Sequence, residues 1–262
     1  MKTYPKVAID LYIVQMVWTG FFLGITIALH IFQLIGSAMW GDGTNDSFYN
    51  SSFISSNIFM LVIGMIAISF LSHYVENGVT RRDYFKGTLL ASVGVSITIP
   101  ILSMILSFVE RLLLGNLLNI TYSDPDINSV IAEIDGGHIG DFIGGMVQQI
   151  IFTPFIDLAD HWVLSLALFS LNIFTYYLLG WLISSAFYHS GVLTGMPMII
   201  LGLVFLTIED TLLRMMLDFP LRYHFTLFDS LPSSATLIII FFIFIFATWL
   251  IHRFTKRVRI KM

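Results

Sequence analysis

The chain has 262 residues, of which 56% are hydrophobic and only 11% charged, and its mean hydropathy is +0.85. A soluble domain of this length has no way to bury so much apolar surface, so the composition excludes a soluble globular protein and indicates an all-α polytopic membrane protein. The absence of cysteine excludes disulfide bonds and thiolate chemistry. The net charge of −4 is less informative than the positions of the charges along the chain.

Six apolar segments are each long enough to cross a hydrocarbon core of about 30 Å at about 1.5 Å per residue. The first is far longer than the apolar region of a signal peptide, which favours a true membrane span. We expect one transmembrane domain over residues 1–262, with no separate soluble domain. The six expected spans are 11–39, 53–72, 88–108, 162–188, 192–213 and 235–251.

The charges predict how the spans are oriented. With both termini cytoplasmic, ten of the thirteen Lys and Arg residues face the cytoplasm, but only three of the seventeen Asp and Glu residues do. The positive-inside rule therefore predicts that both termini are inside. The basic tail 252–262 follows a last span that is apolar on all sides and is expected to face lipid. This tail fits either an anchor on the anionic inner leaflet or a contact with a cytoplasmic partner.

A long outer excursion, 110–161, is expected between spans three and four. Within it, residues 139–156 are moderately apolar but contain Asp141, Gln148 and Gln149. A charge at the centre of a span costs about 2.5–3.5 kcal/mol, and a seventh span would place the basic tail outside. We therefore predict an interfacial or re-entrant helix there, which either caps the outer face of the bundle or contacts a substrate.

Several spans carry polar residues that share one helical face. Such faces point into the bundle or toward a partner rather than into lipid, and they serve either helix packing or the lining of a substrate pathway. The histidine among them is either a hydrogen-bonded helix residue or a proton relay. The candidate pathway residues are Thr19, Thr26, His30, Gln33, Ser92, Ser96, Ser103, Ser107, Glu110, Asn172 and Tyr176.

Motifs for several common chemistries are missing. The chain has no GxxxxGK[ST], no HExxH and no GxSxG, so we do not expect it to hydrolyse ATP or to act as an enzyme. Asp157, Asp160 and His161 contain the right donors for a cation, but their place before the fourth span also fits a solvated helix start. No metal site is predicted.

One short segment resembles an enzyme motif. Glu209-Asp210-Thr211-Leu212-Leu213-Arg214 resembles the EExxxR motif of the CAAX-processing family of intramembrane proteases, with Asp in place of the second Glu. That family completes its site with histidine motifs on later spans, whereas here His224 falls in an outer loop and His252 at the far end of the last span. A charged cluster at the end of a span is the alternative interpretation.

The loop 76–87, ENGVTRRDYFKG, separates the second and third spans and is basic and amphipathic. It resembles the GxxRxxxxxG segment that ABC-2 type ABC transporter permeases of Gram-positive bacteria carry at this place. The resemblance implies a short cytoplasmic coupling helix in which 79–85 docks on an ATP-binding subunit and flanking glycines permit turns. The implied docking residues are Gly78, Val79, Thr80, Arg81, Arg82, Asp83, Tyr84, Phe85, Lys86 and Gly87.

The same resemblance implies a function. The chain would be the permease subunit of an exporter in a bacterial plasma membrane, paired with an ABC ATP-binding subunit and a second permease copy, the same or related. It would hold no cofactor itself, because ATP and Mg²⁺ bind the partner subunit. Its other expected partners are membrane lipids, and no nucleic acid is expected to bind. Staphylococcal exporters of phenol-soluble modulins suggest an amphipathic peptide cargo. The chain departs from the family in having its larger outer loop between spans three and four. An intramembrane protease and a non-transporting scaffold or immunity protein are the alternatives.

Overall fold

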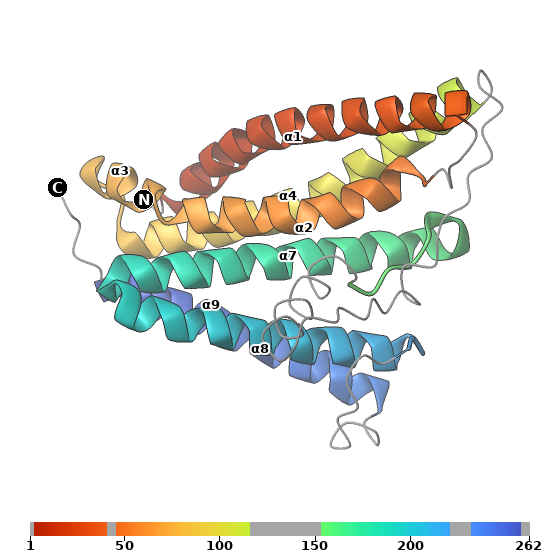
Figure 1. Ribbon diagram of the computed structural model, residues 1–262. Helices are drawn as coiled ribbons and strands as arrows, with labels where there is room; N and C mark the ends of the chain where they lie inside the picture. The colour runs from red at the N-terminus through yellow and green to blue at the C-terminus, as the bar shows by residue number, and fades with distance from the viewer. Residues whose placement is uncertain (1–2, 41–45, 116–152, 221–231, 258–262) are drawn as a thin grey trace.

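The computed structural model describes residues 3–40, 46–115, 153–220 and 232–257, and all the regular structure in these ranges is helical. Figure 1 shows the long helices running roughly side by side as one bundle. The helices are α1 (Tyr4–Trp40), α2 (Phe48–Ala67), α3 (Phe70–Glu76), α4 (Arg81–Glu110), the π-helical turn η1 (Arg111–Gly115), α7 (Leu158–Ser190), α8 (Val192–Met216) and α9 (Ser233–Arg257).

Six helical stretches within the described residues are long and apolar enough to cross a membrane, which confirms the predicted all-α multi-pass membrane protein. The helices extend beyond the apolar segments at most ends. α1 has 37 residues and is therefore about 55 Å long, well above the roughly 30 Å of a hydrocarbon core. Its early start is possible because Pro5 lies in the first turn, where a missing N–H does no harm.

α7 is the central helix of the bundle. It packs against α2, α4, α8 and α9, and Figure 1 shows it between α2 on one side and α8 and α9 on the other. Tyr176, Tyr177 and Trp181 on this helix are fully buried, so large aromatic side chains fill the space around it. Side chains of this size bury a large apolar area each and so contribute strongly to the packing around α7.

Two glycines bring α2 and α7 into direct backbone contact. A Cβ added at Gly64 of α2 would clash with the carbonyl oxygen of Tyr177, and one added at Gly180 of α7 would clash with that of Leu61. Small residues let membrane helices approach closely enough for extensive van der Waals contact. The α2–α7 contact is therefore sterically closed to any larger residue at these two positions.

α1 lies against α4 on one side of the bundle and leaves a broad apolar surface uncovered. Gly87 of α4 allows this approach, since a Cβ there would lie 2.7 Å from Cγ1 of Val7. The uncovered surface suits lipid, because large apolar side chains recur along it. It includes Ile9, Ile13, Val17, Phe21, Ile25 and Leu29.

The predicted interfacial or re-entrant helix 139–156 falls mainly outside the described residues, as does most of the outer excursion. Its described part, 153–156, has no regular secondary structure and leads into α7. Thr153 and Phe155 are buried there, with Phe155 packed against the rings of Tyr49 and Phe53. This segment is consequently part of the bundle core.

Candidate functional site

Basic residues of three helices, α1, α4 and α9, lie at one end of the bundle, called here the basic end. It consists of the start of α1, the turn 77–80, the start of α4 and the end of α9 (Figure 1). The hydroxyl of Thr3 donates to Asp83 Oδ2 at 2.8 Å. Nη1 of Arg81 donates to the carbonyl oxygen of Lys256 at 3.0 Å. Lys86 Nζ lies 5.6 Å from the centre of the Tyr4 ring. The first and last spans are thus both tied to α4 here.

The stretch 76–87 differs from the separate coupling helix expected for it. α3 ends at Glu76, Gly78 adopts a positive φ of 81°, and α4 begins at Arg81 as the first turn of a spanning helix. Thr80 caps α4 by accepting a hydrogen bond from the Asp83 N–H at 3.1 Å. Gly78 serves a turn as predicted, whereas Gly87 lies within α4 and serves helix packing instead.

The aromatic residues of this stretch face inward, which does not fit the docking role that the resemblance implies for them. Tyr84 is fully buried, and its hydroxyl donates to the carbonyl of Ala67, at the break between α2 and α3. Phe85 is 9% exposed and packs against Trp181. Burial of both rings follows from the start of α4 at Arg81, because the next turn of the helix already enters the bundle.

What remains accessible at this turn is polar. Two of the predicted docking residues are only partly accessible. Val79 packs against the core, and the Asp83 carboxylate accepts a hydrogen bond from Thr3. The side chains that project are small or charged, which suits a contact with a soluble surface. The exposed residues of the stretch are Glu76, Asn77, Gly78, Thr80, Arg82 and Lys86.

The polar residues predicted on the first and third spans mostly face the interior. On α1, Thr19 and His30 are buried, Thr26 is partly buried, and Gln33 is exposed, so Gln33 does not face the interior of this chain. Every predicted polar residue of α4 is buried, and the hydroxyls of Ser96 and Ser103 make no hydrogen bond to any described residue. The predicted polar residues of α4, all of them buried, are Ser92, Ser96, Ser103, Ser107 and Glu110.

His30 and Glu110 meet at the end of the bundle opposite the basic end. Nε2 of His30 lies 2.9 Å from Oε1 of Glu110, and both side chains are almost fully buried. The second carboxylate oxygen accepts the backbone N–H of Phe48 at 3.2 Å, and Nδ1 of His30 lies 3.2 Å from the Ser51 hydroxyl. The network joins α1, α2 and α4, so the predicted hydrogen-bonded histidine is present with partners that spacing alone did not identify.

The polar face predicted on the fourth span joins α7 to α2. Nδ2 of Asn172 donates to Oδ1 of Asn57 at 2.7 Å and to the Thr153 hydroxyl at 3.0 Å, and Asn57 Nδ2 lies 3.3 Å from the same hydroxyl. Tyr176 is buried one turn further along α7. Sequence reasoning missed Asn57 and Thr153; an asparagine in the middle of an apolar span was the available signal for the former.

The protease-like segment of α8 is buried and internally paired. Nε of Arg214 lies 3.1 Å from both carboxylate oxygens of Asp210, and its Nη1 donates to the Pro220 carbonyl at 3.1 Å. Glu209 accepts the Thr175 hydroxyl at 2.7 Å. The adjoining cavity measures about 10 Å³, which is room for about one water molecule and no peptide. This geometry favours a structural ion pair over a proteolytic site.

Within the described ranges, no three His, Asp or Glu side chains group together as metal ligands would. His224, the nearest histidine after the α8 motif, lies outside the described residues, as do the last five residues of the basic tail. Comparison of the chain with protein-family models, curated proteins and solved structures finds no match. The class that the fold defines is a multi-pass helical membrane protein with a buried polar interior.

Proposed function

We propose that this chain is the membrane-spanning permease subunit of an ATP-driven exporter in a bacterial plasma membrane. A second permease copy completes the pathway, and two separate ATP-binding subunits supply ATP and Mg²⁺ at the basic end, which faces the cytoplasm. The cargo is amphipathic or hydrophobic, such as a peptide. The proposal rests on the resemblance of 76–87 to the ABC-2 segment and on one structural observation.

That observation is the attachment of the exposed turn 77–80 to several spans at once. The turn joins α3 to α4 directly, Arg81 at its end bonds the main chain of α9, and Asp83 bonds Thr3 just before α1. A soluble subunit that moves this turn therefore moves three spanning helices together. This is the mechanical requirement for a coupling element in a chain that has no nucleotide-binding motif of its own.

The energetic requirement falls on the partner. A ligand changes the balance between two conformations only by its different affinity for each of them, so ATP must bind the closed state of the partner more tightly than the open state. Movement of α1 and α4 then acts on the buried polar residues of these two helices, which include Thr19, Ser96 and Ser103. We assign the pathway to these buried residues and leave out Gln33, whose side chain is exposed.

The decisive experiment is gentle solubilisation of the tagged chain from its native membrane, followed by stoichiometric identification of the co-purifying subunits. A P-loop ATPase in a one-to-one ratio supports the proposal. Arg82→Glu is the diagnostic variant, because Arg82 is exposed at the turn, and it should release the ATPase without loss of membrane insertion. Lys6→Glu, which makes the same charge change on an exposed residue of α1 at the same end, is the matched control and should retain it.

Arg81→Glu is a less informative variant, because Arg81 also holds the end of α9 and its loss disturbs the bundle itself. Recovery of the chain alone, under conditions that preserve known membrane complexes, would contradict the permease proposal. Retention of the ATPase by Arg82→Glu would leave a transporter but disprove docking at this turn.

A further inference from the structure

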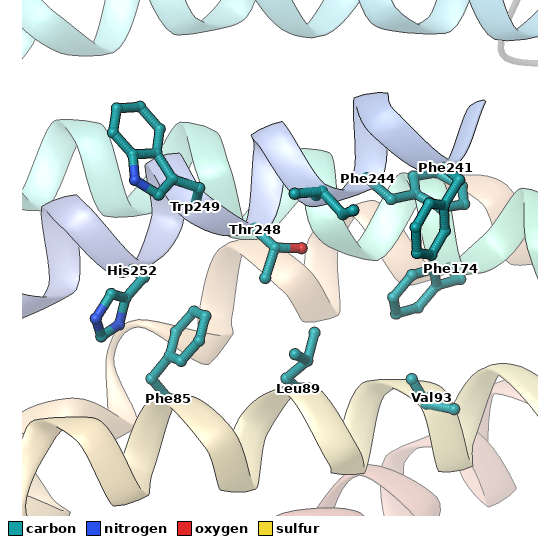
Figure 2. Close-up of a pocket in the computed structure, with 10 residues that line it drawn as sticks. Phe85, Leu89, Val93, Phe174, Phe241, Phe244, Thr248, Trp249 and His252 are labelled. Carbon is teal, nitrogen blue, oxygen red and sulfur yellow. The ribbon is translucent and has the colours of Figure 1, made fainter. Parts of the chain in front are cut away.

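An apolar groove runs between α4 and α9, and its lining includes none of the buried polar residues of α1, α4 and α7 described above. Its volume is about 520 Å³, within the range of roughly 300–1,000 Å³ typical of small-molecule sites. Figure 2 shows side chains of α4 and α9 facing each other across it, with Phe174 of α7 between them. Among the described residues that line it, most are apolar, and the polar groups belong to Thr248, His252 and the indole N–H of Trp249.

The groove is closed at the basic end and at its floor. The rings of Phe85 and His252 lie 4.7 Å apart between their centres, and the bond from Arg81 to Lys256 joins the two helices just beyond them. At the floor, the rings of Phe174 and Phe244 pack edge to face with their centres 5.5 Å apart. Toward the outside, the groove is bordered by the exposed side chains of Val93, Phe241 and Trp249 among others, so it opens on the lipid-facing surface.

The groove has the length of one leaflet. From Phe241 to His252 the rise along α9 is about 16 Å at about 1.5 Å per residue. Half of a hydrocarbon core of about 30 Å is about 15 Å. Because His252 lies at the basic end, the groove extends from the headgroup level of that leaflet to the middle of the membrane.

Positive charge surrounds the end of the groove at headgroup level. The Arg253 guanidinium lies 5.5 Å from the centre of the Trp249 ring, and Lys256 is exposed one turn from His252. Arg82 and Lys256 are both close enough to His252 for their charges to act on it. The nearby carboxylate of Asp83 is held by Thr3. Nδ1 of His252 is buried and makes no hydrogen bond to any described residue.

We propose that the groove binds one acyl chain of an anionic phospholipid from the leaflet at the basic end. The chain lies along Leu89, Val93 and Phe244, and the phosphate is placed beside Arg253 and Lys256. An anionic lipid matches three features together: the apolar lining, the one-leaflet length, and the cations around the headgroup end of the groove. This inference does not depend on the proposed transport function.

The test is a lipid titration of the purified full-length chain in detergent, read by native mass spectrometry. The two probes are dioleoylphosphatidylglycerol and dioleoylphosphatidylcholine, which share acyl chains and differ in headgroup charge. We expect one tightly bound phosphatidylglycerol per chain, with an affinity about tenfold or more above that of phosphatidylcholine, as two cations near an anionic headgroup imply.

Two variants separate the acyl-chain contact from the headgroup contact. Thr248→Trp fills the groove and should remove tight binding of both lipids; Ala28→Trp, on the exposed surface of α1, is its matched control. Replacing both Arg253 and Lys256 with Gln should abolish the preference for phosphatidylglycerol and leave binding of phosphatidylcholine unchanged. If Thr248→Trp does not fold, Val93→Trp fills the groove from its exposed wall.

Several outcomes would overturn the proposal. Equal affinity for both lipids would remove the headgroup assignment, and tight binding that survives both groove-filling variants would place the lipid elsewhere. The masses also reveal other occupants. A dimer that dissociates on Thr248→Trp would show a second copy in the groove, and a co-purified peptide lost from the same variant would show a peptide site.

Discussion

The contact between α2 and α7 and the groove between α4 and α9 are both built from apolar spanning helices, but the first is closed and the second is open. At the first, Gly64 and Gly180 let the backbones touch, so no space is left. At the second, aromatic side chains including Phe85, Phe174 and Phe244 hold the helices apart and line a groove. The size of the side chains at the contact, rather than their hydrophobicity, decides whether two membrane helices close on each other.

The largest effect on stability is expected at the buried ion pair of α8, a helix that packs against α7. Asp210→Ala leaves the Arg214 guanidinium buried without its carboxylate, which should lower the free energy of unfolding by about 3–5 kcal/mol. Denaturant titration in a fixed detergent measures this change. Glu76→Ala, at an exposed carboxylate, should change it by less than about 0.5 kcal/mol. A similar small change for Asp210→Ala would mean that the pair is dispensable.

The α2–α7 contact is tested by adding a single methyl group. Gly64→Ala forces a Cβ against the Tyr177 carbonyl, and overpacking of this kind typically destabilises by about 1–3 kcal/mol. Gly24→Ala is the matched control, because a Cβ at Gly24 meets nothing within 4 Å. Thermal unfolding of both variants measures the difference. Equal melting temperatures would show that α2 and α7 are not in backbone contact.

The asparagine cluster between α2 and α7 should contribute a smaller amount. Asn172→Leu removes hydrogen bonds to Asn57 and Thr153, and interhelical hydrogen bonds in membranes contribute about 0.6–2 kcal/mol. Gln33→Leu on the exposed surface of α1 is the control and should be neutral or slightly stabilising. Melting temperatures in one detergent compare the two. Destabilisation by Gln33→Leu alone would reverse the assignment of interior and surface.

The smallest effect is expected where the groove has room. Val93→Phe enlarges an exposed groove residue into open volume, so its effect on stability should stay within about 0.5 kcal/mol, in contrast to the single methyl group at Gly64. The measurement is again the melting temperature in the same detergent. A loss as large as that of Gly64→Ala would mean that α4 and α9 close on each other as tightly as α2 and α7.

Helical spacing predicted the inward faces better than it predicted their neighbours. Thr19, His30 and Gln33 fall on one side of an ideal helix, yet Gln33 is exposed, because α1 contacts both α4 and α2 and its inward direction changes along its length. Spacing also placed His30 and Glu110 in the interior. Their contact at 2.9 Å depends on α1 and α4 being neighbours, which no property of either segment alone predicts.

The sequence by itself determined that this is a multi-pass helical membrane protein, six of whose described helices are long and apolar enough to span a membrane, because transfer of apolar side chains into a membrane is a property of each segment alone. Only the tertiary structure decided that Tyr84 and Phe85 are buried, that Arg81 holds the end of α9, and that a groove lies between α4 and α9. These features depend on which helices are neighbours and how closely side-chain size lets them approach.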